Sequence, residues 1–174
     1  MRRAIDRFDR IAVLAALCLF LGAVEYMIPK PVPFLRLGLA NLPVLLALGV
    51  LPLPHLLLLI LLKVLGQALI QGALFSYAFL LSFCGSFASG LVMAAAHRLL
   101  GSHISLVGVS ILGALASNTC QLLLAVCLVF GGAGWMIAPL LYGIGLASST
   151  VLGLAAETFW SRSRWVRQLR TASG

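Results

Sequence analysis

Charged and amide side chains are rare in this sequence, and the few that interrupt its apolar stretches recur at helical spacing. Lys63, Gln67 and Gln71 follow one another at every fourth residue, so an α-helix would place them in one stripe. Asn118 and Gln121 are three residues apart and would share one face of another helix. Because amides and ammonium groups hydrogen-bond readily, these residues indicate either a polar binding site or an internal hydrogen-bonded network.

A second concentration of polarity lies between two long apolar stretches, in the segment EYMIPKPVPFLRLGLANLP at 25–43. The segment holds one carboxylate, two cations, one asparagine and four prolines. Glu25 would end the preceding helix, and Asn41 would begin the next one. Since each proline fixes φ and stiffens the chain, we expect residues between them to form a rigid loop that covers the polar side chains as a lid.

The composition places these residues in a membrane protein. Of the 174 residues, 62% are hydrophobic and 9% are charged, whereas soluble domains carry about 25% charged residues. The mean hydropathy is +1.13, and apolar runs of roughly 20 residues, long enough to cross a bilayer, recur along the chain. The runs do not alternate between apolar and polar residues as barrel strands do. The sequence therefore predicts an all-α integral membrane protein.

Glycine, proline and charge divide the chain into about six predicted spans. They cover approximately residues 11–28, 38–51, 54–71, 74–97, 104–129 and 135–158. We expect one membrane domain over 1–174, in which a basic N-terminus (1–10) and a basic tail (159–174) flank a six-helix bundle (11–158). Small residues at spacings of four, such as Ser82, Ser86 and Gly90, would let these helices pack closely within the chain.

The basic residues predict the orientation of the bundle. With six spans, nine of the twelve Lys and Arg residues would share one side, in the two terminal segments and at Arg98. Only Lys30 and Arg36 would lie on the opposite side. Since cytoplasmic segments carry the excess of Lys and Arg, both termini are expected in the cytoplasm and the protein in the cytoplasmic (inner) membrane. Clustering at the ends of apolar spans argues against nucleic acid as a partner.

Lys63 is the residue that most needs an explanation. A charge near the centre of a spanning helix costs about 2.5–3.5 kcal/mol on insertion scales, which indicates an ion pair, a water-filled cavity or a ligand site. Glu25 would be the only carboxylate on the outer side. Two interpretations remain open: a buried Glu25–Lys63 bridge that fixes helix register, or a site in which Lys63 meets a carboxylate or phosphate and Glu25 a cationic or hydroxyl group.

The amides converge on the same outer region, which favours the site. The predicted substrate-binding residues are Glu25, Asn41, Lys63, Gln67, Asn118 and Gln121. We find no Ser/His/Asp set, no paired carboxylates and no ligand-spaced Cys or His cluster in the sequence. We therefore expect no catalytic residue, no metal and no cofactor, and a protein that is not an enzyme.

Several segments resemble a known family. LGLAN at 37–41, preceded by EYMIP at 25–29, is joined in order by LLKVLGQALIQG at 61–72 and GALASNTCQLLLA at 113–125. Together they look like the bacterial membrane family labelled both "heptaprenyl diphosphate synthase component I" and "Gx transporter". The resemblance covers roughly residues 10–157. That family is similar to the substrate-binding S components of energy-coupling factor (ECF) transporters, which are six-helix membrane proteins with an outward-facing pocket.

The two labels imply different functions. Prenyl diphosphate synthases bind magnesium through DDxxD motifs, but Asp6 and Asp9 are the only aspartates in this chain. The first label is therefore compatible only with a non-catalytic membrane partner of isoprenoid synthesis. The transporter label implies a small organic substrate, a membrane T subunit and two ATPase subunits, since the chain has no Walker motif. It also implies that Ala12 and Ala16 dock the T subunit as an AxxxA motif. A membrane subunit of a redox or flavin-handling assembly is a third alternative.

Overall fold

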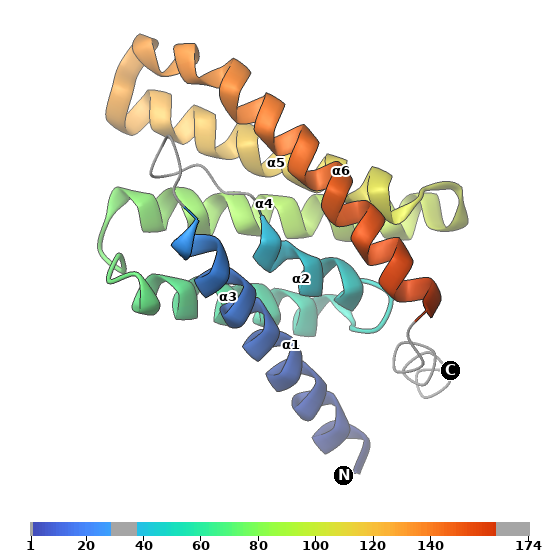
Figure 1. Cartoon of the computed structure of the whole chain (residues 1–174). Coiled ribbons are helices and arrows are strands. Elements are labelled where there is room, and N and C mark those ends of the chain that lie inside the picture. The colour runs from blue at the N-terminus through green and yellow to red at the C-terminus, as the bar shows by residue number, and fades with distance from the viewer. Residues whose placement is uncertain (1, 29–37, 163–174) are drawn as a thin grey trace.

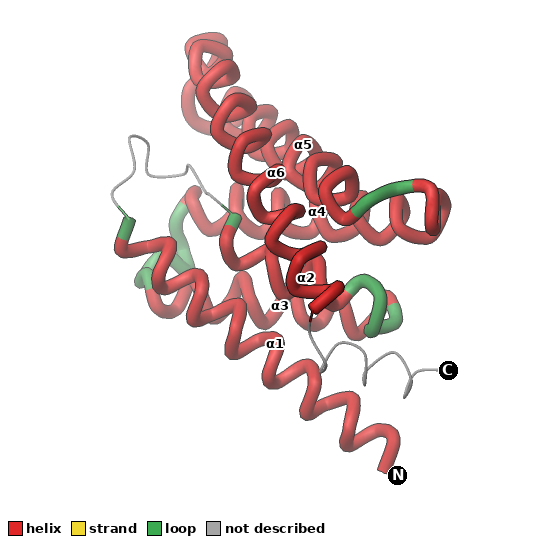
Figure 2. Tube along the Cα trace, turned by 45° about the vertical axis from the view of Figure 1, so that its right-hand side comes forward, coloured by secondary structure: helices red, strands yellow, loops and turns green. Residues whose placement is uncertain are grey.

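The computed structural model describes residues 2–28 and 38–162, and these are almost entirely helical. The α-helices are α1 (Arg2–Met27), α2 (Leu42–Ala47), α3 (Leu53–Ile70), α4 (Tyr77–Leu100), α5 (Leu106–Ala125) and α6 (Ala138–Arg162). Short 3₁₀ turns, η1 (Leu39–Asn41) and η2 (Gly101–His103), precede α2 and α5. Figure 2 shows no strand among the described residues. The predicted fold class, an all-α protein, is confirmed.

Four continuous helical stretches are long and apolar enough to cross a membrane. They are Asp9–Met27, Leu53–Ile70, Tyr77–Leu100 and Leu106–Arg162. The last one contains both α5 and α6, which are joined by a π-helical turn, η3 (Val126–Phe130), and a 3₁₀ segment, η4 (Gly131–Ile137). Because the hydrocarbon core of a bilayer is matched by about 20 apolar helical residues, the chain is an integral membrane protein.

The second predicted span, 38–51, is much shorter than expected. Helix α2 has six residues, and at 1.5 Å per residue it rises about 9 Å, far less than the roughly 30 Å of the hydrocarbon core. Its sequence, LPVLLA, carries a proline in the first turn, where the missing N–H costs nothing. Five of its six residues are buried. Helix α2 is therefore an internal helix packed among the longer ones.

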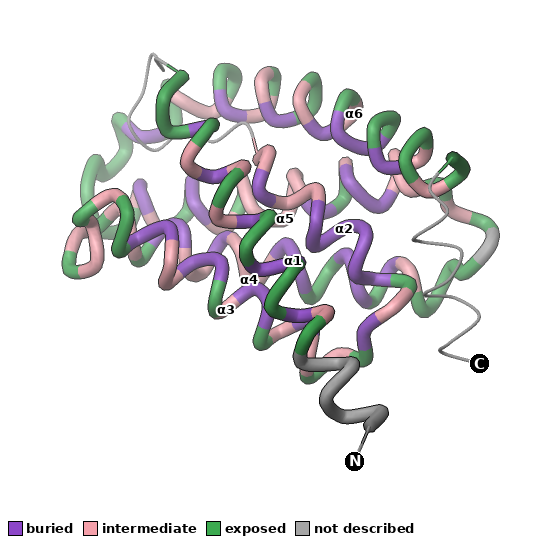
Figure 3. The backbone as a smooth tube through the Cα atoms, turned by 60° about the horizontal axis from the view of Figure 1, so that its bottom comes forward, coloured by how far each residue is buried: buried purple, intermediate pink, exposed green. Residues whose placement is uncertain are grey.

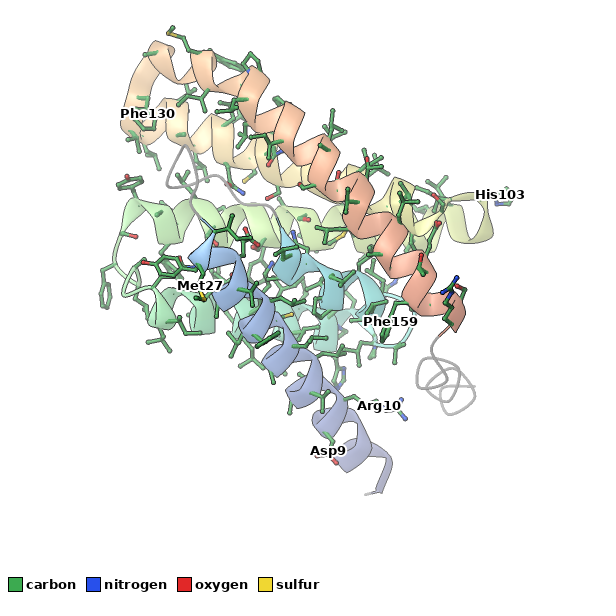
Figure 4. All side chains as sticks on the ribbon, in the orientation of Figure 1. Asp9, Arg10, Met27, His103, Phe130 and Phe159 are labelled. Carbon is green, nitrogen blue, oxygen red and sulfur yellow. The ribbon has the colours of Figure 1, made fainter. Side chains whose placement is uncertain are left out.

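The long helices form two groups that meet along α4. Helices α4, α5 and α6 pack in chain order, and α1 packs on α3, which in turn contacts α4. Helix α2 lies between the groups and touches α1, α3, α5 and α6. The start of α1 and the end of α6 lie toward the same end of the bundle in Figure 1. Figure 4 places Met27 and Phe130 toward the opposite end from Asp9, Arg10 and His103.

The apolar core fills the end of the bundle that carries the start of α1. On α1 the core residues lie at 11–18, and on α3 they lie at 56–64. All of α2 from Val44 to Ala47 belongs to the same core. Figure 3 shows the corresponding pattern, with buried turns facing inward and exposed turns facing outward along α6. A continuous apolar core on one side leaves the other half of the bundle for the polar residues.

Small residues permit the close helix contacts, as their spacing predicted. Gly153 on α6 faces Val107 on α5, and a Cβ added there would lie 2.5 Å from the Val107 Cα. Gly90 on α4 faces Ile60 on α3, but there the nearest atoms belong to the flexible Ile60 side chain. Since a backbone atom cannot swing aside as a flexible side chain can, Gly153 fixes how closely α5 and α6 approach.

The Gly153 contact predicts a matched pair of variants. Gly153→Ala should lower the free energy of unfolding in detergent by about 1–3 kcal/mol, because an extra carbon in a filled contact moves the backbone. Gly143→Ala is the control: Gly143 lies on the same helix, is exposed and has nothing within 4 Å of an added Cβ. The control should be neutral or more stable, since Ala is favoured over Gly within a helix. Equal effects in thermal unfolding would contradict the α5–α6 contact.

Candidate functional site: a polar cavity between the helix groups

A cavity of about 470 Å³ lies between the two helix groups. Its volume falls within the roughly 300–1,000 Å³ of small-molecule sites. All six α-helices or their adjoining turns contribute to its lining. Every residue predicted to bind substrate lines it: Glu25, Asn41, Lys63, Gln67, Asn118 and Gln121. The structure thus brings the six side chains together, while their contact with a ligand stays a prediction.

The two charged residues hold the ends of one short turn. The Glu25 carboxylate on α1 accepts a hydrogen bond from the backbone N–H of Leu39, at 2.9 Å. The Lys63 ammonium on α3 donates to Oδ1 of Asn41. Leu39 and Asn41 are the first and last residues of η1, which leads into α2. Glu25 and Lys63, both about 5% exposed, therefore fix the entry to the buried helix from two sides.

Gly38 makes this arrangement possible. It has φ of +80°, in the left-handed region that favours glycine, and it comes directly before the Leu39 N–H that bonds Glu25. A Cβ at Gly38 would also lie 3.2 Å from the Asn41 amide nitrogen. The LGLAN segment therefore has a physical reason for its glycine: the chain must turn sharply to present η1 to both charges.

We define the clamp as Glu25, Lys63 and the η1 residues Leu39 and Asn41. Holding η1 in this way is a third role for the two charged residues, which neither interpretation of the sequence included. Glu25 and Lys63 position α2 through these bonds, so their burial has a structural reason besides a direct bridge or a ligand contact. Both side chains also line the cavity, which leaves the ligand role open.

Helices α5 and α6 form the opposite, amide- and hydroxyl-bearing wall. The Asn118 amide donates to the backbone oxygen of Leu141 at 3.0 Å, and the Gln121 amide donates to Oγ of Ser117 at 2.8 Å. Gly145 leaves room for Asn118, because an added Cβ would collide with its amide nitrogen. These bonds hold both amides against the wall, so their orientation is set by the protein.

Sequence reasoning missed most of the hydroxyl lining. The serines that line the cavity come from α4, α5 and α6, and they are Ser86, Ser89, Ser110, Ser117, Ser148 and Ser149. One of them, Ser86, had been assigned to helix packing because of its small-residue spacing. Three helices each place two of these serines within seven residues of each other, but small-residue packing of membrane helices gives the same pattern in a sequence.

The cavity is closed toward the apolar core and lined by exposed residues at its other end. Leu42, Leu45 and Met93 line it on the core side, and Leu45 and Met93 are themselves core residues. Tyr26 and Ile28, both exposed, line it where α1 ends. The predicted lid lies outside the described residues over 29–37. The described part of the cavity therefore opens toward the end of the bundle opposite the start of α1.

The predicted docking residues lie on the outer surface of α1. Ala12 and Ala16 are exposed, whereas their neighbours Leu14, Ala15 and Cys18 are buried in the core. The AxxxA pair therefore does not pack within the described part of the chain. Its side of α1 is available to a partner helix, and the identity of any partner stays a prediction.

Within the described residues, no group of three or more His, Cys, Asp or Glu side chains could hold a metal ion. The free cysteines Cys18, Cys84, Cys120 and Cys127 are distributed over α1, α4 and the α5 region. Glu25 is the one carboxylate among the described lining residues of the cavity.

Residues 14–159 match the protein family described as heptaprenyl diphosphate synthase component I. The match covers most of the chain, and the protein belongs to this family, as its sequence segments had indicated. No curated protein and no solved structure matches the chain.

The clamp predicts that Lys63 and Asn41 act as a unit. Lys63→Met and Asn41→Ala should give a coupling energy of about 0.5–3 kcal/mol in a double-mutant cycle measured by unfolding in detergent. Asn41→Ala combined with Thr158→Ala is the control, because Thr158 is exposed near the end of α6 and bonds only within its own helix. That pair should be additive. Additivity of the Lys63 and Asn41 changes would contradict the clamp.

Proposed function

We propose that this protein is the substrate-binding membrane subunit of an ECF-type uptake transporter, comparable to an S component. The observation that carries the proposal is the 470 Å³ cavity, which gathers a lysine, a glutamate, five amide-bearing side chains and six serines within an otherwise apolar bundle. Polar groups inside a membrane are costly and usually serve a substrate or ion pathway. Fixing the register of the helices would not by itself require so many polar groups.

The proposed topology has six helices, with both termini in the cytoplasm. The excess of basic residues in the terminal segments supports this orientation. The cavity would then open to the outside of the cytoplasmic membrane, where a micronutrient or precursor enters. Helix α2 would be the short member of the bundle and would close the cavity toward the cytoplasm.

Transport would be energised by other subunits. The sequence carries no nucleotide-binding loop, so two ATPase subunits and a membrane T subunit would supply the driving force. The exposed pair Ala12 and Ala16 supports a docking face on α1, because small residues let the backbones of membrane helices approach closely.

The family description favours a second candidate, a non-catalytic membrane partner of isoprenoid synthesis. The chain contains four acidic residues in all, and none forms an aspartate-rich magnesium motif. A synthase site would therefore have to lie on a separate subunit. The two candidates differ in which protein co-purifies with this one: a T subunit with its ATPases, or a soluble prenyl synthase.

The docking face provides the test of the proposal. Ala12→Leu combined with Ala16→Leu should abolish co-purification with the T subunit, because the larger side chains hold the partner helix away. The matched control is Ala147→Leu with Ala155→Leu, two exposed alanines on α6, which should leave assembly intact. All variants should unfold at the wild-type temperature. Normal assembly and uptake by the α1 variant would remove the residue-level support for the transporter.

A further inference from the structure

The hydrogen bonds along α6 constrain which side of a ligand can face it. The hydroxyl of Ser148 donates to the backbone oxygen of Gly145 at 3.2 Å, and that of Ser149 donates to Leu146 at 3.1 Å. A hydroxyl has one proton and two acceptor lone pairs. With their protons given to their own helix, both serines present acceptors to the cavity. A donor group on a ligand can bind them without breaking these hydrogen bonds.

Asn118 extends the same acceptor surface onto α5. Its amide nitrogen donates to Leu141, which directs the carbonyl end of the amide away from that bond. Asn118, Ser148 and Ser149 all line the cavity. We define these three residues as the acceptor edge. A ligand matched to this edge carries several O–H or N–H groups on one side, because a buried acceptor left without a donor is destabilising.

The charged lining restricts the net charge of the ligand. Among the described residues that line the cavity, Lys63 and Glu25 carry formal charges, and these sum to zero. Both side chains are buried. A ligand with a net charge would find no matching excess of opposite charge among these residues, because Lys63 and Glu25 compensate each other. A neutral or zwitterionic ligand avoids that cost.

The lining also lacks surfaces on which a flat ring could stack. Tyr26 is the one aromatic side chain among the described lining residues, and it is 60% exposed at the mouth. The apolar lining is confined mainly to the core side, near Leu42, Leu45 and Met93. Neither an aromatic heterocycle nor a long prenyl chain finds a matching surface in the described cavity.

We infer that the ligand is a small, non-aromatic, hydroxyl- or amine-bearing molecule without net charge, whose donors face the acceptor edge on α5 and α6. Aliphatic polyols and hydroxylated amino acids belong to this class. The inference rests on the proposed substrate-binding function and specifies the chemistry of the same site. Specificity would come from the acceptor edge, and the Lys63–Glu25 side would bind the remaining polar groups.

The test uses the purified full-length protein and a defined mixture of water-soluble metabolites in three classes. These are net-neutral polyols and aliphatic amino acids, aromatic vitamins including riboflavin and thiamine, and diphosphates including isopentenyl diphosphate. Equilibrium dialysis with mass spectrometry identifies what the protein retains. We expect retention from the first class alone. Ser149→Ala should weaken that retention between about twofold and tenfold, the range for one hydrogen bond.

Ser161→Ala is the matched control. Ser161 lies on the same helix and donates to the backbone oxygen three residues earlier, at 3.0 Å, but it is exposed and outside the cavity. It should bind as wild type does. Retention of an aromatic vitamin or a diphosphate, or equal affinity in Ser149→Ala and wild type, would overturn the ligand class and leave transport in place.

The absence of any retained compound would also overturn the ligand class, because the mixture contains that class. Co-purification of the T subunit would then still support the proposed function. Loss of both retention and T-subunit assembly would contradict the proposed function itself. The two failures are therefore distinguishable.

Discussion

The structure depends on how two buried charges are satisfied inside an apolar bundle. Isolated charges are costly in a membrane interior, so the Glu25 carboxylate and the Lys63 ammonium must meet polar groups there. Each of them bonds η1, through the Leu39 N–H and the Asn41 side chain respectively. This turn directs α2 into the core, where all but its first residue are buried. The position of the short helix and the polar cavity beside it therefore both follow from the hydrogen bonds between the two buried charges and η1.

The clamp also separates an apolar half from a polar half. Helix α2 contributes Val44–Ala47 to the core and Leu42 and Leu45 to the cavity lining, so it closes the cavity on the core side. Because α4, α5 and α6 pack on one another through glycines, their serines and amides are held at fixed positions on the far wall. A preformed polar site of this kind binds with little reorganisation.

The sequence predicted the helical class and the convergence of six polar residues, because 3.6-residue periodicity places Lys63, Gln67 and Gln71 on one face. It did not predict that the 38–51 segment shrinks to a six-residue helix. Hydropathy measures apolarity, and α2 is apolar because it is buried in protein. The clamp was also missed, since the Leu39 N–H is a backbone group that no side-chain pattern reveals. The sequence alone could not distinguish Ser148 and Ser149 from residues that pack helices together. Their position in the cavity lining makes the distinction.

Thiol accessibility tests the central claim, an aqueous cavity open to the outer side, most directly. Three single cysteines are introduced into a variant without native cysteines: Ser149→Cys, Ala147→Cys and Ser161→Cys. Position 149 lies in the cavity, position 147 faces outward from α6, and position 161 lies at the end of α6 near the terminus. A membrane-impermeant thiol reagent reacts with the thiolate, which requires water. In intact cells it should label Cys at 149 alone, and after permeabilisation also at 161. A residue 149 that reacts only after permeabilisation, or never, would contradict the outward-open cavity.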